Sequence, residues 1–117
     1  MNFRQLAEDL GLEEDEFLEV AELFVETTIS DLDKINTAIM EGDAQGVASA
    51  AHSIKGAAGN LGLMELQEEA GKIEESARSN RLDGTAEAAQ GLKRKLDEIT
   101  RAVEKLSNRT RGEDKES

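Results

Sequence analysis

The sequence predicts an all-α protein, an antiparallel up-down four-helix bundle with a short extra helix at its N-terminus. Three observations support this fold class. The 117 residues contain no proline, the residue that most strongly interrupts helices. Apolar residues recur at three- and four-residue steps over long segments, which is the helical period. The alternation of β-branched and aromatic residues that marks strands is absent.

A short amphipathic helix is expected at the N-terminus, over about residues 3–10. Its apolar positions are Phe3, Leu6, Ala7 and Leu10. Gly11 follows directly and is a plausible stop for this helix. Residues 1–12 are therefore predicted to form a helix that caps the bundle.

A long helix is expected from about residue 13 to Met40. The acidic run at residues 13–16 suits a helix N-terminus, because the helix dipole favours negative charge there. The buried stripe is expected to be Phe17, Ala21, Phe24, Thr28, Leu32, Ile35 and Ile39, widened by Leu18, Val25 and Ile29. Gly42 suits the end of this helix, and Asp43 can cap the next one.

Three further helices are expected, over about residues 44–61, 64–79 and 85–106. Their buried stripes are Val47, Ala51, Ile54, Ala58 and Leu61; then Leu66, Ala70, Ile73 and Ala77; then Ala88, Leu92, Leu96, Ile99, Val103 and Leu106. Short connections make successive helices antiparallel neighbours, so residues 13–107 are predicted to form the four-helix bundle. Residues 108–117 are polar and without periodicity, and they are predicted to be a disordered tail.

The formal net charge is −12, and most of it lies in the first half of the chain. Residues 1–51 contain thirteen acidic and only two basic residues. This charge disfavours binding to nucleic acid, which depends on Lys and Arg, and binding to anionic membrane surfaces. The acidic surface either keeps a small protein soluble or steers it toward a partner with a basic rim.

No apolar run approaches the roughly 20 residues that a membrane-spanning helix needs. The N-terminus also lacks the features of a signal peptide, so a cytoplasmic protein is expected. The absence of cysteine excludes disulfides and thiolate metal sites. With one histidine in the chain, a zinc site is not expected either, because such sites need three or four converging ligands. No metal or cofactor of its own is predicted.

His52 lies within the second of the long predicted helices, and its surroundings are unusual. Helical spacing places one set of mostly small residues on its face, opposite Ile54. The set is Gln45, Ala48, Ser49, Lys55, Gly56 and Gly59. A mid-helix glycine costs about 1 kcal/mol relative to alanine, so the two glycines indicate room for an approaching surface. Close packing between helices remains the alternative explanation for them.

The chemistry that fits this face is phosphoryl transfer through histidine. Imidazole has an ordinary pKa of about 6.5, so much of it is a neutral nucleophile at pH 7. Lys55, three residues further on, can approach an added phosphoryl oxygen. The sequence has no P-loop and no glycine-rich nucleotide loop. The protein is therefore predicted to be a phosphoryl carrier and not a complete enzyme, with the divalent metal supplied by its partner.

The stretch His52-x-x-Lys55-Gly56-x-x-x-x-x-Gly62, with alanines at 57 and 58 and an Asn-Leu-Gly ending, resembles the histidine phosphotransfer (HPt) family. The resemblance implies a four-helix bundle whose exposed histidine exchanges a phosphoryl group with the aspartate of a response-regulator receiver domain. It implies that His52 is the phosphorylated residue and that Lys55 assists charge and docking. It also implies that Gly56 gives the partner access and that Gly62 ends the helix.

The same resemblance gives weaker expectations for other positions. Glu74 falls where some members of the family carry a polar residue near the imidazole. The expected partners are a receiver domain, a hybrid histidine kinase, or both, with Mg²⁺ supplied by the receiver. A monomer is expected, with neither nucleic acid nor membrane as a partner.

Three other assignments remain as alternatives. A histidine-kinase dimerisation helix normally carries an acidic residue after the histidine and a nearby proline, whereas Ser53 follows His52 here. The phosphotransfer domain of a chemotaxis-type kinase has a very similar motif but precedes further domains, whereas this chain is expected to end in a polar tail. A module that binds a receiver without accepting phosphate is disfavoured by the presence of His52.

Overall fold

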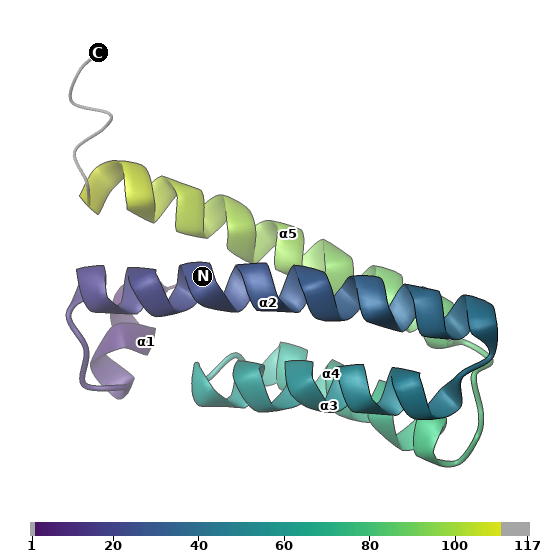
Figure 1. Cartoon of the computed structure of the whole chain (residues 1–117). Coiled ribbons are helices and arrows are strands. Elements are labelled where there is room, and N and C mark those ends of the chain that lie inside the picture. The colour runs from purple at the N-terminus through teal and green to yellow at the C-terminus, as the bar shows by residue number, and fades with distance from the viewer. Residues whose placement is uncertain (1, 111–117) are drawn as a thin grey trace.

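The computed structural model describes residues 2–110, and these form five α-helices without any strand (Figure 1). The all-α prediction is confirmed. The helices are α1 (Phe3–Asp9), α2 (Glu14–Glu41), α3 (Ala44–Asn60), α4 (Met64–Arg78) and α5 (Thr85–Thr110).

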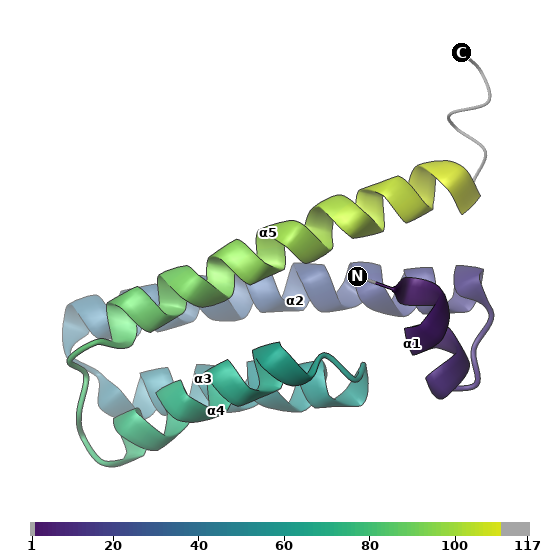
Figure 2. The same cartoon turned by 180° about the vertical axis from the view of Figure 1, so that it is seen from behind.

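The two longest helices, α2 and α5, lie side by side, and α3 and α4 form a shorter hairpin against them (Figures 1 and 2). The chain reverses direction at each connection from α2 to α5. Helix α2 contacts α3 on one side and α5 on the other, while α4 contacts both α3 and α5. The short α1 packs against α2, with the rings of Phe3 and Phe17 5.3 Å apart between centroids. His52, in the middle of α3, is thereby carried on the hairpin.

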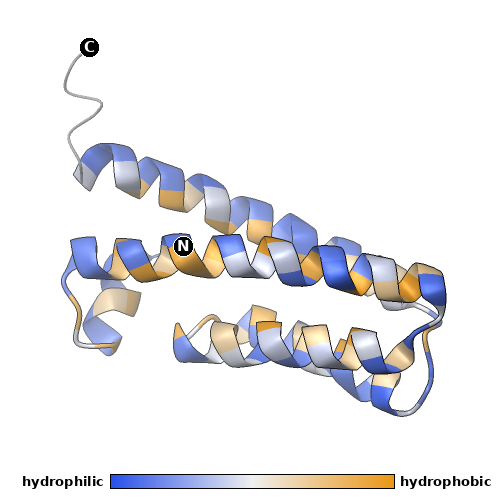
Figure 3. Cartoon of the chain, in the orientation of Figure 1, coloured by the Kyte–Doolittle hydropathy of each residue, from blue (hydrophilic) through white to orange (hydrophobic). Residues whose placement is uncertain are grey.

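One apolar cluster runs between the helices and contains nearly all of the predicted stripe residues. Figure 3 shows how apolar and polar residues share the surface of each long helix. The prediction for Ile29 was wrong, because its side chain is 49% exposed. It lines a pocket between α2 and α5 together with Asp33 and Lys93, so it lies at the margin of the stripe and not within it.

The predicted helix ends agree closely with the structure. Gly42 and Gly62 follow α2 and α3 with left-handed φ angles of 69° and 77°, a conformation that glycine adopts without the steric cost of a Cβ. Asp43 caps α3, since its Oδ1 accepts a hydrogen bond of 2.9 Å from the Gly46 amide. The acidic opening of α2 forms a capping box between Glu13 and Glu16. Sequence signals of this kind act locally, which is why they locate helix ends well.

The end of α5 differs from the prediction, because this helix continues to Thr110. Residues 108–110, expected in the tail, are helical. No proline or glycine interrupts the segment, and Arg109 Nη2 lies 3.8 Å from Glu14 Oε2. The predicted disorder of residues 111–117 lies outside the described residues. Among the helices of residues 2–110, none combines the length and the apolar character that crossing a membrane requires.

Candidate functional site

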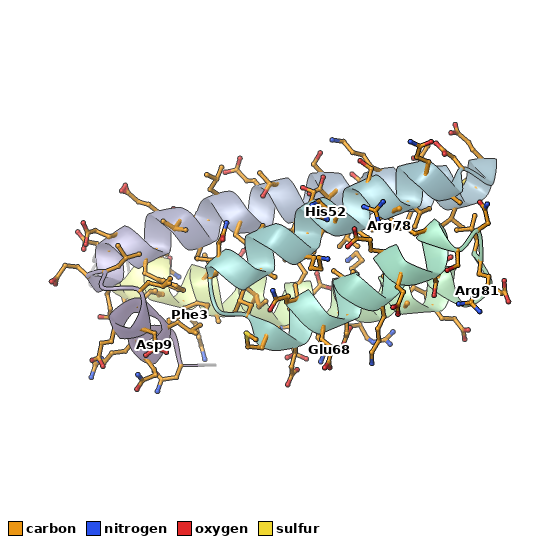
Figure 4. The ribbon with its side chains drawn as sticks, turned by 90° about the horizontal axis from the view of Figure 1, so that it is seen from below. Phe3, Asp9, His52, Glu68, Arg78 and Arg81 are labelled. Carbon is orange, nitrogen blue, oxygen red and sulfur yellow. The ribbon has the colours of Figure 1, made fainter. Side chains whose placement is uncertain are left out.

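The candidate site lies on the outer side of the α3–α4 hairpin, around His52. The core stripe of α3, from Val47 to Ala58, turns toward the bundle interior. The His52 side chain points away from it and is 62% exposed. Figure 4 shows His52 on α3 and Arg78 on α4 near each other on the same side of the hairpin. The predicted outward position of the imidazole is confirmed.

Glu74, from the facing helix α4, lies against the imidazole. Its Oε2 is 3.0 Å from His52 Nδ1, and the residue is only 5% exposed. An ionised carboxylate can only accept hydrogen bonds, so Nδ1 carries the proton in this pair. The structure therefore places Glu74 beside the imidazole, where the family resemblance had suggested a polar residue.

Two cations also converge on Glu74. Lys55 Nζ lies 2.8 Å from Oε1, and Arg78 Nη2 and Nε lie 2.6 and 3.0 Å from Oε2. Arg78 was missed by the sequence analysis. Its spacing of four residues from Glu74 is the usual distance for an ion pair on a helix and could have indicated it. The site is thus one buried carboxylate that accepts hydrogen bonds from His52 and Arg78 at Oε2 and forms an ion pair with the Lys55 ammonium at Oε1.

The environment of Glu74 keeps it ionised. Burial alone raises the pKa of this carboxyl group, but hydrogen bonds from Lys55, Arg78 and His52 outweigh burial and lower the pKa from 4.5 to about 2. Hydrogen bonds to the charged form always favour that form. At neutral pH the acceptor facing His52 is therefore a carboxylate.

This low pKa predicts a pH-dependent contribution to stability. Because the folded pKa of Glu74 lies below its unfolded value, the contribution is complete above about pH 5 and is lost as the pH falls toward 2. Its size is at most about 3 kcal/mol in the free energy of unfolding. Urea unfolding of the native protein and of Glu74→Gln at several pH values measures it. The native protein is expected to lose its advantage over the variant between about pH 5 and 2, and a constant difference across that range would contradict the assignment.

The predicted open surface around His52 is present in part. Gln45, Ser49 and Gly56 are exposed, and no heavy atom outside the local helix lies within 4 Å of the position a Cβ would take at Gly56. That position is free for an approaching molecule. Gly62 lies at the predicted end of α3, one residue after the C-cap Leu61.

Two positions of the predicted surface are corrected by the structure. Ala48 is only 4% exposed and belongs to the apolar core, because the side of α3 that carries it is covered by the bundle. Gly59 is half-buried, and a Cβ there would lie 2.6 Å from Gln67 Nε2 of α4. The alternative of close helix packing therefore holds for Gly59, while the Cβ position at Gly56 is open.

A second polar contact, between α2 and α3, was not foreseen. Ser53 Oγ donates a hydrogen bond of 2.7 Å to Asp31 Oδ2, and Asp31 is only 8% exposed. The bond fixes α2 against α3 at the residue next to His52. The sequence does not indicate this bond, because Asp and Ser are residue types that are common on the exposed face of any helix.

Within residues 2–110 no group of three or more His, Asp or Glu side chains is arranged to hold a metal ion. The carboxylate nearest to His52 is already bonded by Lys55 and Arg78. The site is an exposed imidazole whose Nδ1 is hydrogen-bonded to Glu74. Lys55 and Arg78 lie beside it, and Gly56 leaves the next turn of α3 without a side chain.

Comparisons with known proteins agree with this geometry. The sequence model of the Hpt domain matches residues 19–108. The crystal structure of histidine-containing phosphotransfer protein B (HptB) from Pseudomonas aeruginosa PAO1 is similar, with a TM-score of 0.82 and 28% sequence identity over 93% of this chain and 95% of that chain. A comparison with curated proteins gave no match.

Proposed function

Because this chain belongs to the Hpt domain family, we propose that it accepts a phosphoryl group on His52 and exchanges it with the aspartate of a response-regulator receiver domain. The observation that carries this proposal is an imidazole 62% exposed to solvent whose Nδ1 is bonded to a buried carboxylate. The protein is a phosphorelay carrier in two-component signalling, and it relies on its partner for the remaining catalytic groups.

Glu74 determines which ring nitrogen reacts. Since Nδ1–H donates to Glu74, the lone pair of the neutral imidazole is on Nε2. A carboxylate behind the ring also stabilises the positive charge that the ring gains when Nε2 forms a new bond. Glu74 is thus a positioning residue for the nucleophile His52.

The transfer step follows from this tautomer. The Nε2 lone pair attacks the phosphorus of the aspartyl phosphate, an N–P bond forms, and the P–O bond to the aspartate breaks. The aspartate leaves as a carboxylate, and the ring becomes a phosphoimidazolium that keeps its Nδ1 proton. No proton has to leave the ring, and the reverse step returns the phosphoryl group to an aspartate. The divalent ion that such transfer needs is supplied by the receiver.

Lys55 and Arg78 provide positive charge beside the nucleophile. Both reach Glu74 in this structure, and their side chains remain 37% and 60% exposed. After transfer, the phosphoryl group adds negative charge at the same place, and both cations can share hydrogen bonds with its oxygens. The pair stabilises phosphohistidine and the transition state that leads to it.

The receiver docks over the bare part of α3 and the adjacent edge of α2. The Asp31–Ser53 bond aligns these antiparallel helices. Leu23 and Asn60 both lie about 11 Å along the axes from that bond, on the same side of it, so they lie at the same level of the two helices. Leu23 and Val20 are 61% and 42% exposed, which gives the docking surface an apolar part toward the Asn60 end of α3. The acidic residues that flank Leu23 on α2 favour a receiver with a basic rim.

The proposal also covers the arrangement of the helices and the partners of the protein. In our proposal the helices α2–α5 act as an antiparallel up-down bundle, α1 caps its end, and the protein works as a cytoplasmic monomer. Its partners are a receiver domain, a hybrid histidine kinase, or both. It needs no cofactor of its own, and neither nucleic acid nor membrane takes part.

Nitrogen NMR of the phosphorylated protein tests this mechanism. Protein with ¹⁵N-labelled histidine is phosphorylated with phosphoramidate, and the ring nitrogens are assigned through their coupling to ³¹P. The phosphoryl group is expected on Nε2, with Nδ1 protonated both before and after the reaction. Phosphorylation at Nδ1, or a phosphate ester on another side chain, would contradict the role assigned to Glu74 and His52.

A further inference from the structure

Where α3 and α4 cross, each helix places a glycine beneath a long side chain of the other. The Lys55 stem of α3 lies over Gly71 of α4, with Cδ 3.4 Å from the position a Cβ would take. In the reciprocal contact, Gln67 of α4 lies over Gly59 of α3. Both contacts lie on the Gly59 side of the His52–Glu74 pair, and the nearer one places the Lys55 side chain on the surface of α4.

The backbone does not require glycine at position 71. Gly71 lies at the centre of α4, and the glycines with positive φ among residues 2–110 are Gly11, Gly42, Gly62 and Gly84. Glycine is also among the least favourable residues in a helix interior. Glycine at position 71 is therefore explained by the space that its missing side chain leaves, and not by its backbone conformation.

The space over Gly71 is used by one side chain. After crossing Gly71, Lys55 ends with its ammonium 2.8 Å from Glu74 Oε1, and its side chain is 37% exposed. A free surface lysine samples many rotamers, and holding it costs conformational entropy. Here Gly71 leaves room for the Lys55 stem, and the carboxylate of Glu74 binds its ammonium. Together they hold the lysine side chain in one conformation.

We propose that Gly71 is a positioning residue of the phosphotransfer site, because its bare surface lets Lys55 reach Glu74 and stay beside His52. The contact itself is independent of what His52 does, whereas its importance for transfer rests on the proposed function. A larger side chain at position 71 displaces the Lys55 stem, and its ammonium then leaves Glu74.

The size of the substituent decides the outcome. In Gly71→Ala the new Cβ stands 3.4 Å from Lys55 Cδ, an ordinary contact, so Lys55 keeps its place. Gly71→Val adds two γ-methyl groups on a stiff β-branched side chain, which cannot both avoid the lysine stem. Gly91→Val is the matched control, since Gly91 lies within α5 and the nearest side-chain atom to its Cβ position is Glu69 Oε1 at 3.8 Å.

The first measurement reads the lysine directly and needs no phosphoryl transfer. Carboxyl ¹³C NMR titration follows the pKa of Glu74, which the hydrogen bonds of Lys55, Arg78 and His52 hold at about 2 against the effect of burial. We expect Gly71→Val to raise this pKa to the value found in Lys55→Ala. Gly71→Ala and Gly91→Val are expected to leave it unchanged.

The second measurement is the rate of phosphoryl transfer from a phosphorylated receiver. Gly71→Val is expected to slow transfer about tenfold, the loss that one charge-assisted hydrogen bond accounts for. In the Lys55→Ala background the same substitution is expected to cost nothing further, because two changes that remove the same interaction are not additive. A general effect of position 71 on folding would not produce that dependence on Lys55.

An unchanged Glu74 pKa in Gly71→Val, or an equal slowing with and without Lys55, would overturn the proposal. If valine prevents folding, Gly71→Thr, which also carries two atoms beyond Cβ on a β-branched side chain, is subjected to the same two measurements and the same criteria. The Glu74 pKa could rise in Gly71→Val while the native protein transfers no phosphoryl group. That result would support the Gly71–Lys55 contact and refute the function proposed for His52. The two claims are therefore separable.

Discussion

His52→Gln is expected to reduce phosphoryl acceptance from a phosphorylated receiver by more than about 10³-fold, the scale seen when a nucleophile is removed from an active site. The amide of glutamine is not a nucleophile, so no N–P bond can form. The same amide can still donate a hydrogen bond toward Glu74, as His52 Nδ1 does. The substitution thus removes the reacting atom while keeping a donor for the buried carboxylate.

The control for this variant is its fold. His52 is largely exposed, and substitutions at exposed positions usually change the free energy of unfolding by less than about 0.5 kcal/mol. Circular dichroism and thermal unfolding are therefore expected to match those of the native protein. A folded His52→Gln variant that still accepted phosphate at a comparable rate would show that another residue is the acceptor.

Gly56→Leu is expected to slow transfer from a receiver by about 100-fold, since a displacement of about 1 Å in the reacting groups can cost that much. Gly56 lies four residues after His52, one helical turn away, on the same open face. Nothing lies within 4 Å of its Cβ position, so leucine extends into the space that the receiver occupies in our proposal. The initial rate of transfer with each variant measures the effect.

Two comparisons separate access from folding in this variant. The helix itself gains, because leucine is more favourable than glycine in a helix by up to about 1 kcal/mol, and the thermal stability is expected to be retained or raised. Phosphorylation by phosphoramidate, which is small, is expected to continue at nearly the native rate. If Gly56→Leu unfolds the bundle or slows both donors equally, Gly56 has a packing role and the docking surface is misplaced.

Much of this site could be predicted because its signals are local. The outward position of His52 follows from the period of the apolar residues on α3, and the ends of that helix follow from Asp43 and Gly62. Both depend on residues within a few positions of each other along the chain. Neither requires knowledge of which helix packs against which.

The errors occurred where a neighbouring helix decides the environment. Ala48 and Gly59 were assigned to the open face because helical spacing gives only an angle around one axis. Their burial depends on the neighbouring helices, α4 in the case of Gly59, and that angle does not say where those helices lie. Ile29 was misassigned at the edge of the α2 stripe for the same reason.

Contacts between distant residues were the least predictable part. A glutamate is almost never fully buried unless it is paired, so the sequence gave little reason to expect that Glu74 is buried between the helices. Its burial depends on Lys55 from α3 and on Arg78 from its own helix. The Asp31–Ser53 bond and the course of Lys55 over Gly71 likewise exist only once the helices have packed.

Mapping the phosphoryl group after transfer shows whether His52 is the residue that accepts it. A receiver phosphorylated on its aspartate is mixed with the native protein, and the modified peptide is identified by mass spectrometry under conditions that preserve N–P bonds. We predict that the phosphoryl group leaves the receiver and is found on His52, with the acid lability of a phosphoramidate. A phosphoryl group that stays on the receiver, or that appears on any other residue, would contradict this prediction.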